Sequence, residues 1–128
     1  MPNAIIKQLA DIPGYSPPNH SGTVNRKLVE AAFGAGFEMI HGEVQPGGDA
    51  SPHFHKRTYQ IVYVLDGILE HTVDDEPPQR CGPGTVIQIP PLVRHRGVGV
   101  GDRPAKVLVL YSPPLTPEDI FFPDGHVP

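Results

Sequence analysis

Short runs of apolar, β-branched residues separated by clusters of Gly, Pro and Asp dominate the hydrophobic pattern of this 128-residue chain. Each run is about one strand long and ends at a turn signal, which is typical of β-strands. The predicted strands are residues 39–44, 59–67, 68–73, 84–90 and 105–111. Residues 4–12 and 117–122 leave room for a short helix. Short strands at regular spacing predict an all-β fold, an antiparallel sandwich or barrel.

The composition supports this fold class. In a disordered chain, 17 prolines and 14 glycines would accompany few aliphatic residues, whereas here they separate aliphatic segments. A chain of 128 residues is long enough to bury one core. Because we find no internal repeat or linker, we expect a single domain over residues 1–128.

Charge and cysteine content narrow the functional classes. The net charge is −4 and the Lys and Arg residues are scattered, which argues against nucleic acid or an anionic membrane as a partner. The single cysteine, Cys81, excludes an intrachain disulfide and favours a reducing compartment. No apolar run approaches the roughly 20 residues of a membrane helix, and the N-terminus lacks a secretion signal. We therefore expect a cytoplasmic protein.

Histidines mark the candidate chemistry. His53 and His55 are two residues apart, so in a strand both imidazoles point to one face and can converge on one metal ion. Gln60 opens the next strand, and His95 follows the strand at 84–90. Taken alone, such a pair could equally be two surface histidines on a loop.

The wider spacing resembles the two motifs of the cupin superfamily. The first is Gly47, five residues, His53-Phe54-His55, four residues, Gln60, six residues and Gly67. The second is Gly84, five residues, Pro90, Leu92, two residues, His95, three residues and Gly99. The resemblance covers 47–67 and 84–99 and implies a jelly-roll barrel. It also implies one divalent metal ion inside, held by His53, His55, Gln60 and His95.

Three positions depart from the usual motifs. Leu92 stands where cupins usually have Gly, which costs little if φ there is negative. Gly99 stands in place of a structural Asn. Gln60 replaces Glu, so a divalent ion would have only neutral ligands and would be the stronger Lewis acid. Ni, Fe, Zn, Co and Mn all suit such N/O ligands.

Within the superfamily, the chain is similar to a small Gln-containing branch with pectin-degradation cupins and polyketide cyclases. The matching pieces are Tyr59-Gln60, YVLDG at 63–67 and YSPPL at 111–115. In uronate-converting members the closing motif carries Asp and Arg, where this chain has Val109 and Leu115. That difference counts against the uronate reaction. Tyr111 keeps the aromatic residue of the motif.

The catalytic candidates are His71, Tyr111 and Tyr59. His71 shares an apolar face with Leu69 and Val73, so we expect it to point inward and act as a general base. The alternative is a histidine with a purely structural role, as also for His41. Tyr59 is expected near the mouth of the barrel, where it could meet a carboxylate or phenol.

These features give three functional hypotheses. The first is an enzyme that uses its metal as a Lewis acid to isomerise, cyclise, open or dehydrate a small oxygenated molecule. The second is a dioxygenase acting on a flavonol-, diketone- or catechol-like substrate, which oxygen consumption would reveal. The third is a non-catalytic cupin that binds a small ligand, which an absence of metal would favour. We expect a homodimer, because a jelly roll has exposed edge strands.

Overall fold

The structure is a computed structural model that describes residues 3–123. These residues form ten β-strands and three single 3-10 turns. The strands are β1 (His20–Val29), β2 (Glu38–Ala50), β3 (Phe54–His55), β4 (Tyr59–Asp66), β5 (Ile68–Val73), β6 (Gln79–Cys81), β7 (Val86–Ile89), β8 (His95–Val100), β9 (Ala105–Ser112) and β10 (Ile120–Phe121). The turns are η1 (Leu9–Asp11), η2 (Ala31–Phe33) and η3 (Pro117–Asp119).

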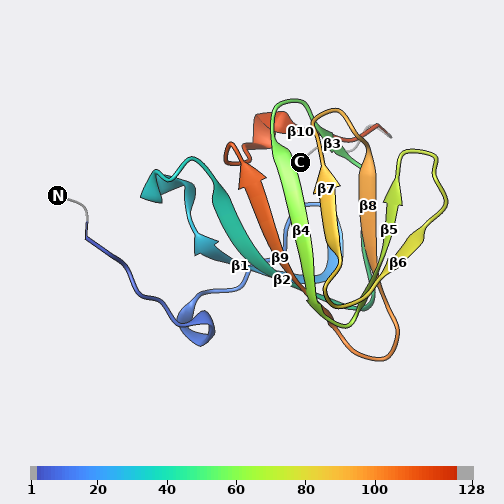
Figure 1. Cartoon of the computed structure of the whole chain (residues 1–128), viewed down its shortest axis with the longest axis horizontal. Helices are drawn as coiled ribbons and strands as arrows, with labels where there is room; N and C mark the ends of the chain where they lie inside the picture. The colour runs from blue at the N-terminus through green and yellow to red at the C-terminus, as the bar shows by residue number, and fades with distance from the viewer. Residues whose placement is uncertain (1–2, 124–128) are drawn as a thin grey trace.

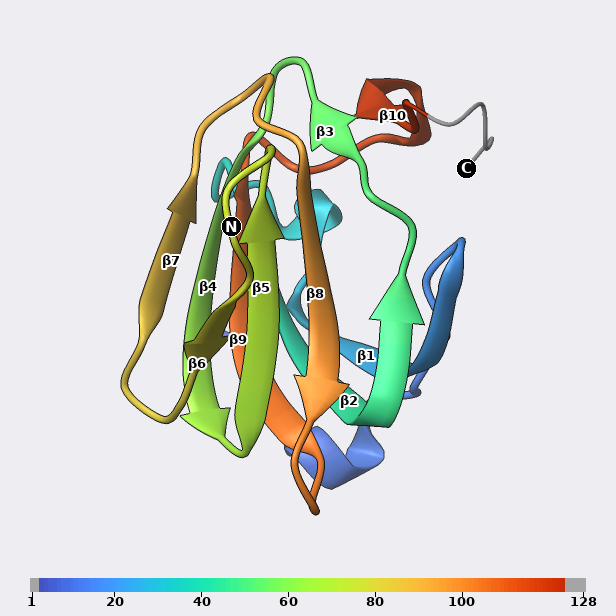
Figure 2. The same cartoon turned by 90° about the vertical axis from the view of Figure 1, so that its right-hand side faces the viewer.

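The strands pair into antiparallel sheets that face one another, as Figures 1 and 2 show. One sheet has the order β1-β2-β9-β4-β7, the second has the order β6-β5-β8, and β10 pairs with β3. Strand β8 runs beside β2, so the two larger sheets enclose a common interior (Figure 2). The all-β prediction is confirmed, and the arrangement is the expected jelly-roll barrel.

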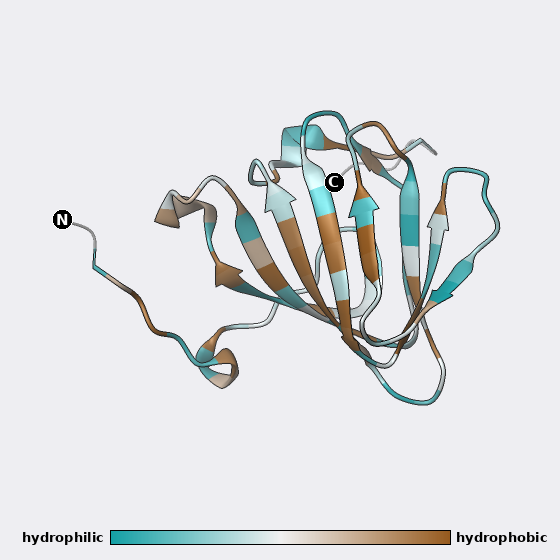
Figure 3. Ribbon diagram, in the orientation of Figure 1, coloured by the Kyte–Doolittle hydropathy of each residue, from teal (hydrophilic) through white to brown (hydrophobic). Residues whose placement is uncertain are grey.

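Alternation along the strands places the core between the sheets. In β4, Val62 and Val64 are buried, whereas Tyr63 and Leu65 on the other face are about 40% exposed. Brown apolar bands cross the five-stranded sheet in Figure 3. The buried apolar residues form two neighbouring clusters, which are Ile40, Val62, Val64, Cys81, Val107 and Val109, and Val44, Leu69 and Ala105.

The two segments that left room for a short helix form only single 3-10 turns. Within 4–12 only η1 is helical, and Ile6 is 91% exposed, so no apolar face is buried to stabilise a longer helix. Within 117–122, η3 is followed directly by β10. Among the described residues, no helix is long and apolar enough to cross a bilayer.

Besides the two-residue strands β3 and β10, the sequence pattern did not predict β1, β6 or β8. Strand β1 was not predicted because its inward positions are polar: Thr23, Asn25 and Lys27 all line the interior cavity. An alternation rule that looks for apolar inward positions does not recognise such a strand.

The turn before β8 corrects one expectation. Leu92 adopts φ +74°, the left-handed conformation that glycine favours, and its side chain is 66% exposed. An L-residue pays about 1–2 kcal/mol for this conformation. The Leu92 amide donates to the carbonyl oxygen of His55 at 2.6 Å, so the turn is anchored beside the histidines.

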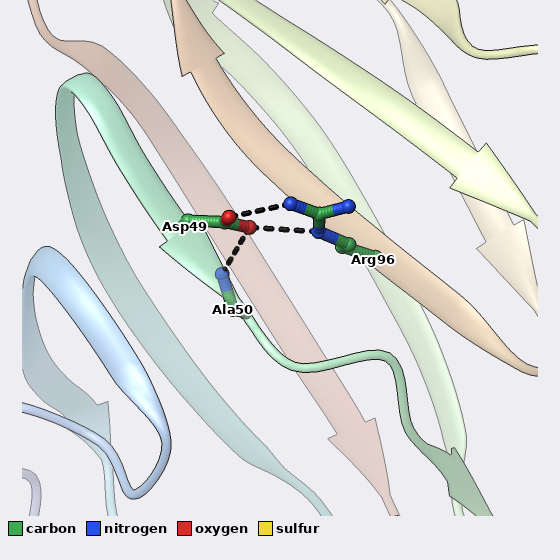
Figure 4. A network of polar contacts seen from close by, with 3 residues as sticks. All are labelled: Asp49, Ala50 and Arg96. Atoms are coloured by element: carbon green, nitrogen blue, oxygen red, sulfur yellow. Dashed lines mark hydrogen bonds and ion pairs between the residues drawn. The ribbon is translucent and has the colours of Figure 1, made fainter. Parts of the chain in front are cut away.

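Gly99 stands where β8 approaches β2. A Cβ there would lie 2.2 Å from the carbonyl oxygen of Gln45, so the Asn expected at this motif position has no room. Nearby, the Asp49 carboxylate accepts hydrogen bonds from the Arg96 guanidinium and from the Ala50 amide, as Figure 4 shows. The Arg96 bonds lower the pKa of Asp49. This network ties the end of β2 to β8 next to His95.

Asp119 organises the loop between β3 and β4. Its carboxylate is buried and accepts the backbone N–H groups of Lys56, Arg57 and Thr58 at 3.0–3.2 Å. Burial alone would raise the pKa of Asp119, but these N–H donors hold it below its usual range. The loop joins His55 to Gln60, so Asp119 fixes how these two side chains lie relative to each other.

We predict that Asp119→Ala lowers the free energy of unfolding by about 2–3 kcal/mol, because three amides lose a charged acceptor. Urea denaturation measures the change. Glu118→Ala is the matched control, since Glu118 is the exposed neighbour in the same turn. Equal losses in the two variants would contradict this role for Asp119.

Candidate metal centre

Three imidazoles meet where β3 and β8 come together. The backbones of His53 and His95 pair directly, with N–H···O distances of 3.1 and 2.8 Å. Their ring centroids are 4.3 Å apart, and His55 lies 5.3 Å from His53 and 5.2 Å from His95. One ring nitrogen from each residue lies within 4.8 Å of the others, a spacing that suits a shared metal ion.

Backbone carbonyls set the orientation of two of these rings. Nδ1 of His53 lies 3.0 Å from the Ser51 oxygen, and Nδ1 of His95 lies 3.0 Å from the Val93 oxygen. A carbonyl only accepts, so Nδ1 carries the proton in both rings and Nε2 keeps its lone pair. A neutral ring with one free nitrogen lone pair can bind a metal ion, here through Nε2.

Ring nitrogens of two of these histidines are buried and have no hydrogen-bond partner. Nε2 of His55, Nε2 of His95 and Oε1 of Gln60 are buried and make no hydrogen bond. Gln60 is the second residue of β4, pairs with Ile89 and Tyr111, and points into the cavity. Buried polar atoms without a partner are rare and costly. Three imidazole nitrogens and one amide oxygen are a donor set that fits a divalent cation.

All the imidazoles here are neutral at pH 7. Burial, with a smaller contribution from His53, lowers the pKa of His55 and His71 to about 4. Burial likewise lowers the pKa of His53 and brings that of His95 well below its ordinary value. Neutral rings offer free lone pairs, and no carboxylate belongs to the three-histidine group.

His71 lines the same cavity, and its ring stacks near that of His95 with centroids 6.1 Å apart. The preference for His71 over His41 agrees with this placement. His41 alternates with Ile40 and Gly42, which line the cavity, and therefore faces the other side of the sheet.

The two tyrosine candidates lie on opposite faces. Tyr111 lines the cavity with its ring 5.9 Å from that of His55, and burial raises the pKa of its phenol. Tyr59 is 56% exposed and does not line the cavity. Because Gln60 points inward, its neighbour in the strand must point outward. Tyr59 therefore does not face the histidine cluster, and its part in catalysis stays a prediction.

A polar group that the sequence reasoning missed lies across the cavity. The side chain of Glu38 is 6% exposed, and its Oε2 lies 3.4 Å from Nζ of Lys27. Tyr15 and Asn25 line the cavity beside this pair. Glu38 could have been found, because it shares an inward face with Ile40, Gly42 and Val44. Lys27 could not, because β1 was not predicted.

The cavity between these polar groups has a volume of about 440 Å³, within the usual range for small-molecule sites. Its wall between the two polar ends is apolar. The wall residues include Ile40, Val62, Leu69, Val107, Val109 and Leu115.

Several known proteins are similar to this chain in sequence or in structure. Protein SchB of Streptomyces halstedii is 40% identical over 117 residues, covering 87% of this chain and 79% of SchB. L-ectoine synthase of Bordetella petrii is 28% identical over 124 residues, covering 94% and 91%. The solved structure of the polyketide cyclase RemF from Streptomyces resistomycificus superposes with a TM-score of 0.77 at 28% identity, covering 86% and 80%.

The sequence model of the family described as "Cupin domain" matches residues 40–111. This range includes the three histidines, Gln60 and most of the apolar cavity wall. The barrel, the paired motifs and these relatives agree. The chain belongs to the cupin family.

Proposed function

We propose that this cupin is a metal-dependent enzyme that closes or dehydrates a ring in a small, oxygen-rich molecule of the polyketide type, without redox change. The observation that carries the proposal is the set of buried, unpartnered atoms in the histidine cluster: Nε2 of His55, Nε2 of His95 and Oε1 of Gln60. The similarity to a polyketide cyclase supports the substrate class.

His53, His55, Gln60 and His95 would hold one divalent ion, for which Ni, Fe, Zn, Co and Mn are the candidates. When bound there, the ion would supply Lewis-acid polarisation of a substrate carbonyl. The four ligand side chains are neutral, so they would leave its charge undiminished, which favours this chemistry over oxidation of the ion.

The chain's own groups would orient the substrate and move protons. His71 is neutral at pH 7 and faces the cavity, so it can accept a proton from the substrate. Tyr111 stays protonated because its pKa is raised, so its phenol can donate a hydrogen bond. Val109 and Leu115 keep this part of the cavity apolar, which suits an aromatic or polyketone skeleton better than a uronate.

We also propose that the chain forms a homodimer in the cytoplasm. Tyr63, Leu65 and Val86 are at least 40% exposed, and the first two lie on the outer face of β4. The edge strand β7 carries Val86, so this surface has both apolar side chains and free backbone groups for a second copy.

An anaerobic assay tests the reaction. The protein is loaded in turn with Zn, Ni, Mn or ferrous iron and mixed with a synthetic poly-β-ketone thioester. We expect mass spectrometry to show a ring-closed product that has lost one water, formed at the same rate with and without oxygen. Product that requires oxygen would favour the dioxygenase instead, and no product with any metal would contradict both.

Removing one ligand tests the metal centre. We predict that His53→Ala weakens metal binding by roughly 100-fold or more and abolishes turnover, because the remaining ligands cannot close the site. Metal content after dialysis and calorimetric titration measure the loss. His41→Ala is the control, since His41 is a buried histidine outside the cavity. Full metal content and turnover in His53→Ala would rule the centre out.

Acid should destabilise the metal-free protein. His55 and His71 have pKa values of about 4 in the folded state and 6.5 as the ordinary value. Between these values the unfolded chain binds more protons, so the free energy of unfolding falls as pH drops from 6.5 towards 4. Thermal melts at pH 7.5, 6 and 5 should show a steady decline below 6.5. An unchanged melting temperature at pH 5 would contradict the buried, neutral state of these rings.

A further inference from the structure

The Lys27–Glu38 pair differs from the other ion pairs of residues 3–123. In the other pairs both side chains are at least one-third exposed, and the Asp or Glu side chain is 34–98% exposed. In this pair the Glu38 side chain is only 6% exposed. Both residues of the pair line the cavity. A buried carboxylate is expensive unless it is fully paired, so a cavity that keeps one in its wall invites a functional explanation.

The contacts of the pair leave hydrogen-bonding capacity unused. Oε1 of Glu38 accepts the Leu115 amide at 3.1 Å, and Oε2 faces Lys27. Each carboxylate oxygen can accept a second hydrogen bond, and the Lys27 ammonium has three protons to donate. Lys27 also lies over the Tyr15 ring, with Nζ 5.8 Å from its centroid, which holds the ammonium at this end of the cavity.

The strand register fixes where the pair lies relative to the histidine cluster. Glu38, Tyr111 and Gln60 are direct neighbours across β2, β9 and β4. Adjacent strands are about 4.8 Å apart, so the backbones of Glu38 and Gln60 are about 10 Å apart. The next inward-facing row is Ile40, Val109 and Val62, all apolar. The cavity thus has two polar ends joined by an apolar wall.

We propose that Lys27 and Glu38 form a second polar subsite, which binds a neutral hydroxyl group at the end of the substrate remote from the histidine cluster. A hydroxyl can accept from Lys27 and donate to Glu38 at once. A carboxylate would be repelled by Glu38, and an apolar end would cover the two charged groups without offering them a hydrogen bond. The inference rests on the proposed function, because the histidine cluster defines the other end of the substrate.

The subsite therefore selects an elongated, hydroxylated ring system with oxygen functions at both ends. Sites built to bind a hydroxyl reject analogues that lack it far more strongly than apolar pockets reject a missing methylene. Lys27 and Glu38 act here on binding and specificity, while His71 lies beside His95 and Tyr111 lies between Glu38 and Gln60.

Two rigid probes test this selection. 5,7-Dihydroxychromone and 5-hydroxychromone share the carbonyl and hydroxyl that would face the histidines and differ only in the hydroxyl at the opposite end. Calorimetric titration of the zinc-loaded protein should show roughly tenfold tighter binding of the dihydroxy compound. Equal affinities, or no binding of either chromone, would overturn the proposal.

The variants locate the preference. In the double variant Lys27→Met with Glu38→Leu, the ratio of the two affinities should fall to near one. The control double variant, Lys106→Met with Glu43→Leu, replaces a Lys–Glu pair that is in register across β2 and β9 and lies outside the cavity, and it should keep the wild-type ratio. Should the cavity variant fail to fold, Glu38→Gln keeps the shape and should reduce the ratio several-fold. A ratio unchanged by these cavity substitutions would overturn the proposal.

The same titrations separate this proposal from the metal centre. Zinc content of the protein reports on the histidines alone. If none of Zn, Ni, Fe, Co and Mn binds, the proposed function fails, and the chromone ratio is then measured on the metal-free protein, in which Lys27 and Glu38 are intact. A preference that persists there and disappears in the double variant would support the subsite even so.

Discussion

Neighbouring side chains in a β-strand point to opposite faces of the sheet, and in this barrel one of those faces is the wall of the cavity. That constraint decides which residues can share chemistry. It brings Gln60 inward and sends Tyr59 outward on β4, and it brings Glu38 inward while His41 faces away on β2. A shift of register by one residue would exchange all four. The Asp119 carboxylate and the left-handed turn at Leu92 matter because they hold the strand ends on which this register depends.

Burial in an apolar barrel gives the histidine cluster its character. Each buried polar atom without a partner costs about 1–3 kcal/mol, and Nε2 of His55, Nε2 of His95 and Oε1 of Gln60 are all in this state. The same burial keeps the rings neutral by lowering their pKa values. The protein thus keeps these electron-pair donor atoms away from water and from each other. A cation that all of them coordinate would bind the folded state alone and stabilise it.

Much of the barrel was predictable because its strands follow simple alternation between turn residues. The spacing of His53 and His55 predicted that these two converge, and the resemblance to the cupin motifs added His95 to them. The errors have physical causes. Strand β1 is polar on its inward face, so no apolar pattern marks it, and Lys27 was therefore missed. The φ of Leu92 follows from tertiary anchoring to His55, which no local preference encodes.

The closing segment of the chain gives the cavity a different polarity from the one that the uronate-converting motif implies, although the barrel is the same. In the uronate-converting cupins that the sequence resembles, the positions of Val109 and Leu115 carry charge, and here both side chains are apolar wall. The Leu115 amide nevertheless donates to Glu38, whose carboxylate comes from a different strand. In this chain the charged groups at this end of the cavity come from β1 and β2, whereas β9 and its following loop supply apolar side chains. The loop still takes part through its backbone, because the Leu115 amide holds the Glu38 carboxylate in place.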